Sequence, residues 1–132
     1  MIDLYSVDLT SAAAQTIQWN VKSLQRGTSA TIDRDKMTIH LNEPGVYRVY
    51  VHGYGNTTAA GTFGFQITGD GVDIVRGAAS MSTAAGAVGN VAFSTPVSVN
   101  RIGGTDKATL SLKYTGGAGT ISLVEIGIEK VA

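Results

Sequence analysis

Short alternating runs divided by glycines constrain this chain more than any other feature of its sequence. Within each run, large apolar residues alternate with small or polar ones, which is the period of a β-strand that buries one face. The clearest runs occupy residues 37–41, 62–68, 91–99, 107–114 and 120–131. The chain holds 17 glycines and only 2 prolines. The pattern therefore predicts about eight to ten short strands, arranged as a sandwich or a barrel.

Three further segments can be assigned from their local pattern. Residues 15–24 alternate as a strand, although the alanines at 12–14, which follow the helix-capping residue type Ser11, leave a helix open as the alternative. The sequence GDG at 69–71 predicts a tight turn with positive φ. Residues 78–89 are small and of low complexity, so we expect a surface loop there.

Length and composition restrict the classes of protein to which the chain can belong. Its 132 residues predict a single domain over residues 1–132. Ten basic residues balance ten acidic ones and only 15% are charged, which argues against a nucleic-acid partner. The absence of cysteine excludes disulfides. No apolar run approaches the about 20 residues of a membrane span, and residues 1–10 lack the apolar core of a signal peptide.

The stretch EPGVYRVYVHGYG at residues 43–55 places large side chains on both faces of its expected strand. One face carries Tyr47, Val49 and Val51, which suit the core of a sandwich. The closing strand repeats this pattern, with apolar residues on both of its faces. Two such strands predict a sheet that a second chain covers, and a closed ring of three heterologous contacts is one way to supply that cover.

The predicted contact surface between copies combines the second faces of these two strands. It consists of Val46, Arg48, Tyr50, His52, Tyr54, Ile121, Leu123 and Glu125. Since a buried charge needs a partner, we expect Glu125 or Glu129 to face Arg48 and His52. The alternative is a monomer with exposed tyrosines, because scattered surface apolar residues are normal. A pH-sensitive contact through His52 is a further hypothesis.

Three motifs resemble segments of the C1q/TNF-like jelly-roll family, over a range from about residue 15 to residue 132. MTIHLNEPGVYRVYVHGYG at 37–55 is similar to its central segment, in which a Pro-Gly-Val-Tyr turn precedes a long aromatic strand. IGGTDKATLSLKYTG at 102–116 is similar to the segment in which Gly-Asp enters the penultimate strand, although Thr105 is inserted here between Gly104 and Asp106. GTISLVEIGIEKVA at 119–132 is similar to the closing strand.

The resemblance implies a fold, an assembly and a chain path. The implied fold is all-β, a ten-stranded jelly-roll sandwich of two sheets, and the implied assembly is a homotrimer packed around the inner sheet. Residues 42–45 would carry the chain from one sheet to the other. The local pattern alone favours a hairpin between 37–41 and 46–54 instead, so the two expectations differ in a way that the structure can decide.

Few residues are suited to catalysis or to metal binding. His40 and His52 cannot complete a zinc site without cysteine unless carboxylates contribute. Asp70 and Asp73 fall short of the ligands of a calcium site, and a turn explains them more simply. Trp19 alternates within residues 15–24, so we expect it in the core rather than as a platform for a sugar. We therefore expect no catalytic residue, no metal and no cofactor.

The resemblance is closest to the bacterial and phage members of the family. Together with the lack of a signal-peptide pattern and of a catalytic site, it implies a non-enzymatic, trimeric jelly-roll protein of a phage virion that decorates the capsid or forms the head of a fibre or spike. Its expected partners are copies of itself, other virion proteins or a host-surface receptor. A receptor- or carbohydrate-binding module at a fibre tip is the alternative. Its expected contact loops contain Asn56, Thr57, Thr58, Ser82 and Thr83. A jelly-roll enzyme is a second alternative, and it would need clustered histidines and carboxylates.

Overall fold

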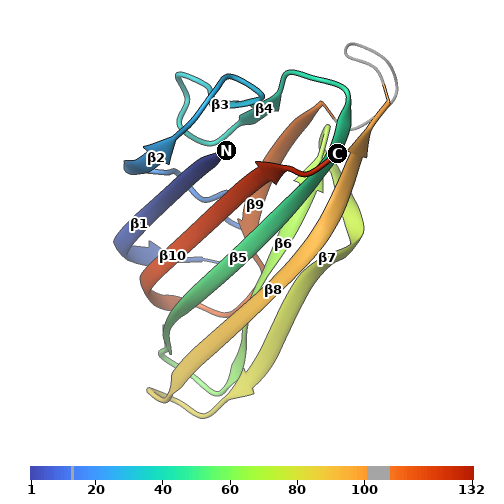
Figure 1. Ribbon diagram of the computed structural model, residues 1–132. Coiled ribbons are helices and arrows are strands. Elements are labelled where there is room, and N and C mark those ends of the chain that lie inside the picture. Colours follow the sequence, from blue (N-terminus) through green and yellow to red (C-terminus); the bar gives the residue numbers. More distant parts are fainter. Residues whose placement is uncertain (13, 101–107) are drawn as a thin grey trace.

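The computed structural model describes residues 1–12, 14–100 and 108–132, and these residues form strands but no helix. Ten strands occur among them (Figure 1). They are β1 Ile2–Ser11, β2 Val21–Gln25, β3 Ala30–Ile32, β4 Ile39–Leu41, β5 Gly45–Thr57, β6 Gly61–Gly69, β7 Val72–Thr83, β8 Val88–Val99, β9 Thr109–Tyr114 and β10 Gly119–Lys130. No helix of the described residues is therefore long and apolar enough to cross a membrane.

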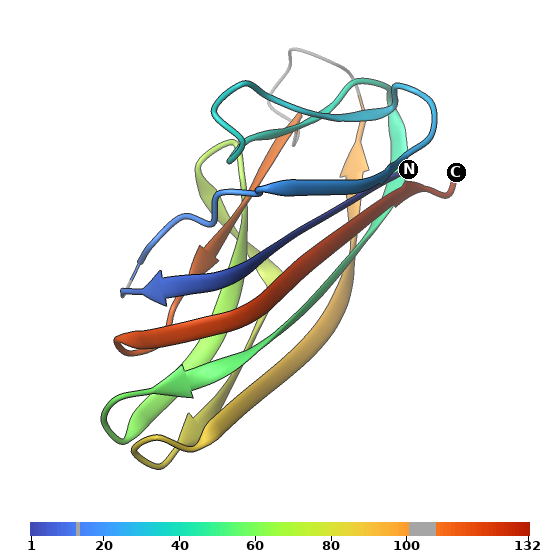
Figure 2. The ribbon, with the colours of Figure 1, turned by 90° about the vertical axis from the view of Figure 1, so that its left-hand side faces the viewer.

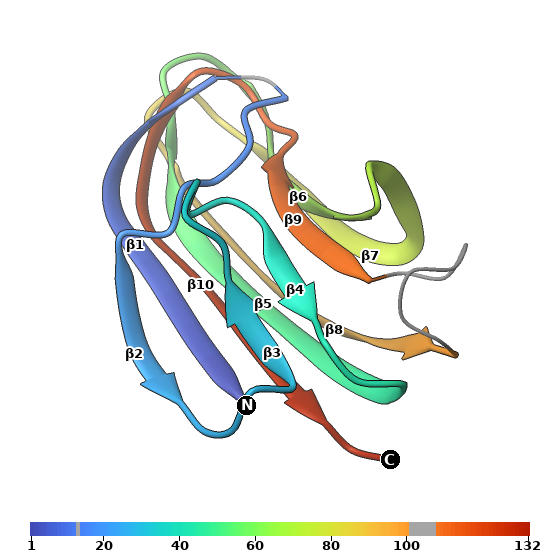
Figure 3. The ribbon, with the colours of Figure 1, turned by 90° about the horizontal axis from the view of Figure 1, so that it is seen from above.

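The strands pair into two five-stranded antiparallel sheets. Sheet I has the order β2-β1-β10-β5-β8, and sheet II has the order β3-β4-β9-β6-β7. Seen from above, the two sheets lie face to face as two layers (Figure 3). The two chain ends lie close together at one end of the sandwich (Figure 2). The predicted all-β, ten-stranded, two-sheet jelly roll is confirmed for the described residues.

The core lies between the sheets and is built from the alternating residues. Tyr47, Val49 and Val51 of β5 are fully buried, as their spacing predicts. Across the core, the rings of Phe63, Phe65 and Tyr114 pack edge to face, with centroids 5.5–5.6 Å apart. Full burial of a side chain of this size is worth about 1.5–3 kcal/mol, so the core supplies the main stabilisation of the sandwich. Trp19 also lies in the core, as expected.

The connection after β4 crosses from sheet II to sheet I, so the implied crossover is confirmed and the local prediction of a hairpin is wrong. The Tyr47 hydroxyl donates a hydrogen bond to the Glu43 carbonyl oxygen at 2.7 Å, which ties the crossover to the core. Gly45 begins β5 with φ of 144°, a conformation that favours glycine. A Cβ at this position would also meet the Ala132 carbonyl oxygen.

The N-terminal quarter of the chain differs from the sequence-based expectation. β1 was not predicted, although it lies between β2 and β10 in sheet I. The predicted strand over 15–24 is wrong at its start, because only Val21–Gln25 belongs to a strand. The backbone N–H of Ile17 donates a hydrogen bond to the carbonyl oxygen of Leu112, whereas the backbone N–H of Trp19 donates one to the carbonyl oxygen of Lys36. These residues therefore bridge separate elements and do not follow a single neighbouring strand. The alternative helix does not form in the described residues.

The predicted surface loop over 78–89 is also wrong. Residues 78–83 complete β7, residues 88–89 begin β8, and only the turn at 84–87 lies between them. The small side chains fit because β7 is an edge strand paired with the glycine-containing β6. The predicted turn at GDG is confirmed, since Asp70 and Gly71 have φ of 49° and 83°. Residues 102–107 of the motif at 102–116 lie outside the described residues, as does Ala13, whereas residues 109–114 of the motif form β9.

Candidate interaction surface

Strand β5 presents the predicted second face on the outside of sheet I. Arg48, Tyr50 and Tyr54 are exposed, and Val46 and His52 are half-buried. Figure 1 views this outer face, with β5 and β10 near its centre. The structure therefore brings together the five β5 residues predicted for the contact surface. Whether another copy covers them stays a prediction.

Strand β10 divides its predicted contact residues between the two faces. Ile121 is fully buried in the core, so its assignment to the contact surface is wrong. Ile121 pairs with Gly55 and Leu123 pairs with Tyr54, which leaves Ser122 as an extra residue in a β-bulge. A bulge of one residue reverses the alternation beyond it. Leu123 and Glu125 consequently lie on the outer face, where both are half-buried.

Strand β1 adds residues to this face that were not predicted. Tyr5 lies opposite Glu125, and Val7 lies opposite Leu123 in the pairing of β1 with β10. Val7 is exposed, and Tyr5 is half-buried. The alternation of Ile2 and Leu4 with polar residues could have identified the strand, but not its place beside the last strand of the chain.

His52 lies between two acceptors on the outer face. Its Nδ1 is 3.1 Å from Glu125 Oε1, and its Nε2 is 3.0 Å from Asn90 Oδ1. The prediction that Glu125 faces His52 is confirmed. Arg48 lies opposite Glu129 in the strand register, but within the described residues the two side chains form no ion pair. The outer face thus places the rings of Tyr50 and Tyr54 next to His52, whose two ring nitrogens both have hydrogen-bond partners within the same chain.

Two hollows on the outer face have both Gly127 and Tyr50 among their lining residues. A hollow of about 170 Å³ is lined in part by Asp3, Tyr5, Tyr50 and Glu125. A smaller one of about 130 Å³ has Tyr50 and Arg48 among its lining residues. Burial, and then the nearby Glu125 carboxylate, raises the pKa of the Tyr50 hydroxyl. The larger hollow is therefore an acidic depression between aromatic side chains, and we call it the Gly127 hollow.

The predicted contact loops of the receptor-binding alternative are only partly exposed. Thr57 and Thr83 are buried, and their Oγ1 atoms form a hydrogen bond at 2.8 Å. This bond joins the ends of β5 and β7, so both residues are wrong as surface contacts. Asn56, Thr58 and Ser82 are exposed. Asn56 and Ser82 lie within strands, and Thr58 directly follows β5.

Carboxylates and histidines away from this face have structural partners. Asp70 accepts a hydrogen bond from the Thr109 hydroxyl at 2.8 Å, and Asp73 accepts one from Lys113 Nζ at 3.2 Å. His40 Nε2 lies 3.7 Å from Asp33 Oδ1. In the part of the chain that the structure describes, no three histidine, aspartate or glutamate side chains are grouped to hold a metal ion.

No family model and no curated protein matches the sequence, but solved structures match the fold. The vertex protein P5 of PRD1 has a TM-score of 0.67 and 16% identity, over 99% of this chain and 96% of P5. Murine APRIL has a TM-score of 0.65 and 12% identity over 98% of both chains. The globular domain of zebrafish complement 1qA has a TM-score of 0.62 and 13% identity, over 95% and 90%.

These matches include the N-terminal strand, so the likeness extends beyond the predicted start near residue 15. Proteins with the TNF/C1q fold typically form homotrimers, and the fold is typically non-catalytic. Sequence identities of this size show the fold alone. The two sheets, the crossover before β5 and the structural matches together show that this chain has the C1q/TNF-like jelly-roll fold.

Proposed function

We propose that the chain is a non-enzymatic structural protein of a virion, which assembles as a homotrimer through the outer face of sheet I. The observation that carries the proposal is the gathering of exposed apolar side chains on this face. Val7 of β1, Val21 of β2, and Tyr50 and Tyr54 of β5 all lie there, so three separate strands contribute to the patch. A contiguous apolar patch rimmed by polar residues is typical of a protein interface.

The fold supports the assembly, since its known members typically form homotrimers. Each copy already covers the inner face of sheet I with its own core, so only another chain can cover the outer face. Three copies related by a threefold axis repeat the same contact three times and leave no contact surface unpaired. The face is also polar in part, and the pairing of His52 with Glu125 reduces the cost of enclosing both groups.

The likeness to a phage vertex protein supports a place on the capsid surface or at the head of a fibre. The non-catalytic character of the fold supports a role in assembly and surface contact. The receptor-binding alternative loses two of its five contact residues, because Thr57 and Thr83 are buried. It therefore has less support than the structural role.

Single cysteines can test the covered face, because the chain has no cysteine of its own. Ser94 lies opposite Tyr50 on the outer face, and Ser94→Cys changes one atom. Arg34→Cys places the matched control in an exposed turn next to sheet II. We expect maleimide to label residue 94 at least about tenfold more slowly than residue 34 in the native protein, with equal rates in denaturant. Equal rates in the native protein would contradict the proposed assembly.

Immunogold labelling can test the location. Particles purified from cultures that carry the gene are labelled with antibody against the chain. We expect gold at the capsid surface or at fibre heads. Unlabelled particles, with the chain recovered only in the particle-free fraction, would contradict the virion role without affecting the proposed homotrimer.

A further inference from the structure

Strand β7 leaves its ladder with β6 at residues 74–77. Thr68 pairs with Asp73 and Gln66 pairs with Ala78, so the single residue Ile67 lies opposite four residues of β7. The result is a wide bulge at the edge of sheet II, which we call the 74–77 bulge. Bulges of this kind reorient side chains and are often found at sheet edges.

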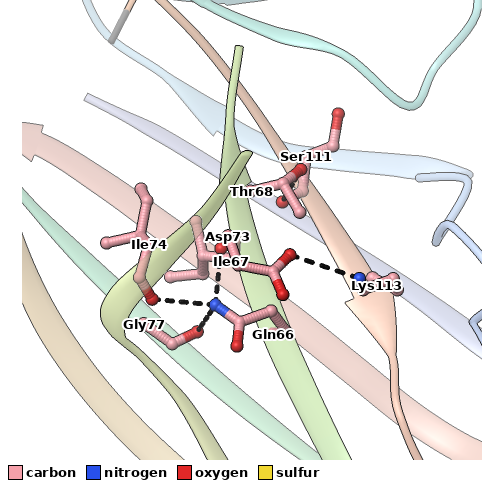
Figure 4. A network of polar contacts seen from close by, with 8 residues as sticks. All are labelled: Gln66, Ile67, Thr68, Asp73, Ile74, Gly77, Ser111 and Lys113. Carbon is pink, nitrogen blue, oxygen red and sulfur yellow. Dashed lines mark hydrogen bonds and ion pairs between the residues drawn. The ribbon is translucent and has the colours of Figure 1, made fainter. Parts of the chain in front are cut away.

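One side chain holds the 74–77 bulge in place. Gln66 Nε2 lies 2.8 Å from the Ile67 and Ile74 carbonyl oxygens and 3.3 Å from that of Gly77, and donates to all three (Figure 4). An amide has two N–H donors, so one of them is shared. The ion pair of Asp73 with Lys113 fixes the strand just before the bulge. The bulge is therefore a built feature with its own polar anchor.

The bulge presents an apolar and a cationic side chain to solvent. Val75 is 97% exposed. Arg76 is exposed, and within the described residues its guanidinium makes no hydrogen bond or ion pair. Beside the bulge, an apolar cleft of about 400 Å³ is lined by Val72, Val75 and Pro96, among others. Protection of a sheet edge explains the presence of a bulge, but it does not explain an apolar tip.

Exposed large apolar residues of the described chain fall almost entirely on two surfaces. Nine such residues are exposed. Five lie on the outer face of sheet I, where Val88 shares the side of Asn90 and Ser94, and three lie on the edge strand β7 of sheet II, namely Val72, Val75 and Met81. Only Val131, beyond β10, lies on neither surface. Two different surfaces of this kind on one chain suit a heterologous contact, in which the edge of one copy meets the face of the next.

The charges of the two surfaces are complementary. The Gly127 hollow on the face contains the carboxylates of Asp3 and Glu125. A Cβ on Gly127 would lie 2.7 Å from Asp3 Oδ1. Because glycine has no Cβ, a group that enters the hollow can approach the Asp3 carboxylate. The edge supplies Arg76, whose guanidinium has no partner among the residues that the structure describes. Complementary charges fix the register of a contact and disfavour wrong partners.

We infer that the 74–77 bulge, anchored by Gln66, is the element with which one copy engages the next, and that Val75 and Arg76 enter the Gly127 hollow of the second copy. This inference rests on the proposed homotrimer. Arg76 then meets the Asp3 carboxylate of the neighbouring copy, and Val75 packs against the tyrosines that border the hollow. The Gln66 amide acts as a positioning group, because it holds the bulge without touching the second copy.

Charge reversal tests the inference on the full chain by sedimentation equilibrium. We expect Arg76→Glu to raise the concentration of half-dissociation at least about tenfold. Asp3→Lys should have a similar effect alone. The double variant with both changes should recover at least about half of the loss on a logarithmic scale, because the reversed charges again attract. Arg34→Glu is the matched control and should leave the assembly unchanged.

The outcomes separate this inference from the proposal on which it rests. If wild type is a trimer and Arg76→Glu dissociates no more easily than Arg34→Glu, the bulge is not the contact and only the inference is overturned. Independent, additive losses in the double variant would also overturn the pairing of Arg76 with Asp3. A monomeric wild-type chain would overturn the homotrimer itself. Because Arg76 is exposed, its substitution should leave the fold intact. A circular dichroism spectrum equal to that of wild type should confirm that each variant is folded.

Discussion

Truncation of Tyr50 to alanine should dissociate the proposed homotrimer without unfolding the single chain. Tyr50 lies on the outer face, near the middle of β5, and borders both hollows beside Gly127. Its side chain points away from the core, so its removal leaves the packing between the sheets intact. The stability of the separate copy should therefore change by less than about 0.5 kcal/mol.

The expected magnitude follows from the exposed area of Tyr50. Its surface is 44% exposed in the single chain. A tyrosine offers about 200 Å², so a second copy can remove about 90 Å² from water, worth about 2 kcal/mol per contact at about 25 cal/mol/Å². Three contacts give about 6–7 kcal/mol. The concentration of half-dissociation varies as the square root of the trimer dissociation constant, so it should rise by about two orders of magnitude.

Sedimentation equilibrium over a wide range of protein concentrations measures this shift. Tyr50→Phe is the matched control, because it keeps the ring that the contact buries and removes only the hydroxyl. We expect Tyr50→Phe to remain within about threefold of wild type. A similarly small shift for Tyr50→Ala would refute the reasoning, since it would mean that no second copy covers the ring.

Three other predictions follow from the same structure. Ile121→Ala should lower the free energy of unfolding by about 2–5 kcal/mol, which a urea titration measures. Leu123→Ala should leave that free energy within about 1 kcal/mol of wild type but weaken assembly, which sedimentation equilibrium measures. Gly53→Ala should destabilise the chain by about 1–3 kcal/mol in urea, because its Cβ would lie 2.5 Å from Phe65 Cε2. Burial raises the pKa of Tyr47 above 10.0, so its neutral form favours folding. The contribution of the neutral hydroxyl to the free energy of unfolding is fully present below about pH 10 and is lost as the pH rises through the folded-state pKa. The urea midpoint should therefore fall less at alkaline pH in Tyr47→Phe than in wild type.

Regular alternation was sufficient to assign the two faces of β5, although it misplaced the start of the strand predicted over 15–24. The two faces of β5 follow from residues 46–54 alone, because a strand has a strict period of two and one face needs a core. The crossover before β5 required the family likeness, since a Pro-Gly turn between two runs is locally a hairpin signal. Only the pairing of β5 with β10 and β8 in sheet I decides between the two paths.

The two bulges could not be located from the sequence. In β10, Ile121 and Val124 are both buried although they are three residues apart, and nothing in the local residues marks Ser122 as the extra one. In β7, the bulge depends on a glutamine from the neighbouring strand. Both features arise from pairing between strands, which also explains why β1, the partner of the last strand, was missed.

The molar mass of the wild-type chain in solution tests the central claim most directly. Light scattering coupled to size-exclusion chromatography, at micromolar protein, should give about 41 kDa, three times the 13.7 kDa of one chain. A mass of 13.7 kDa that does not rise with concentration would contradict the account, because the outer face of sheet I would then have no second copy to cover it.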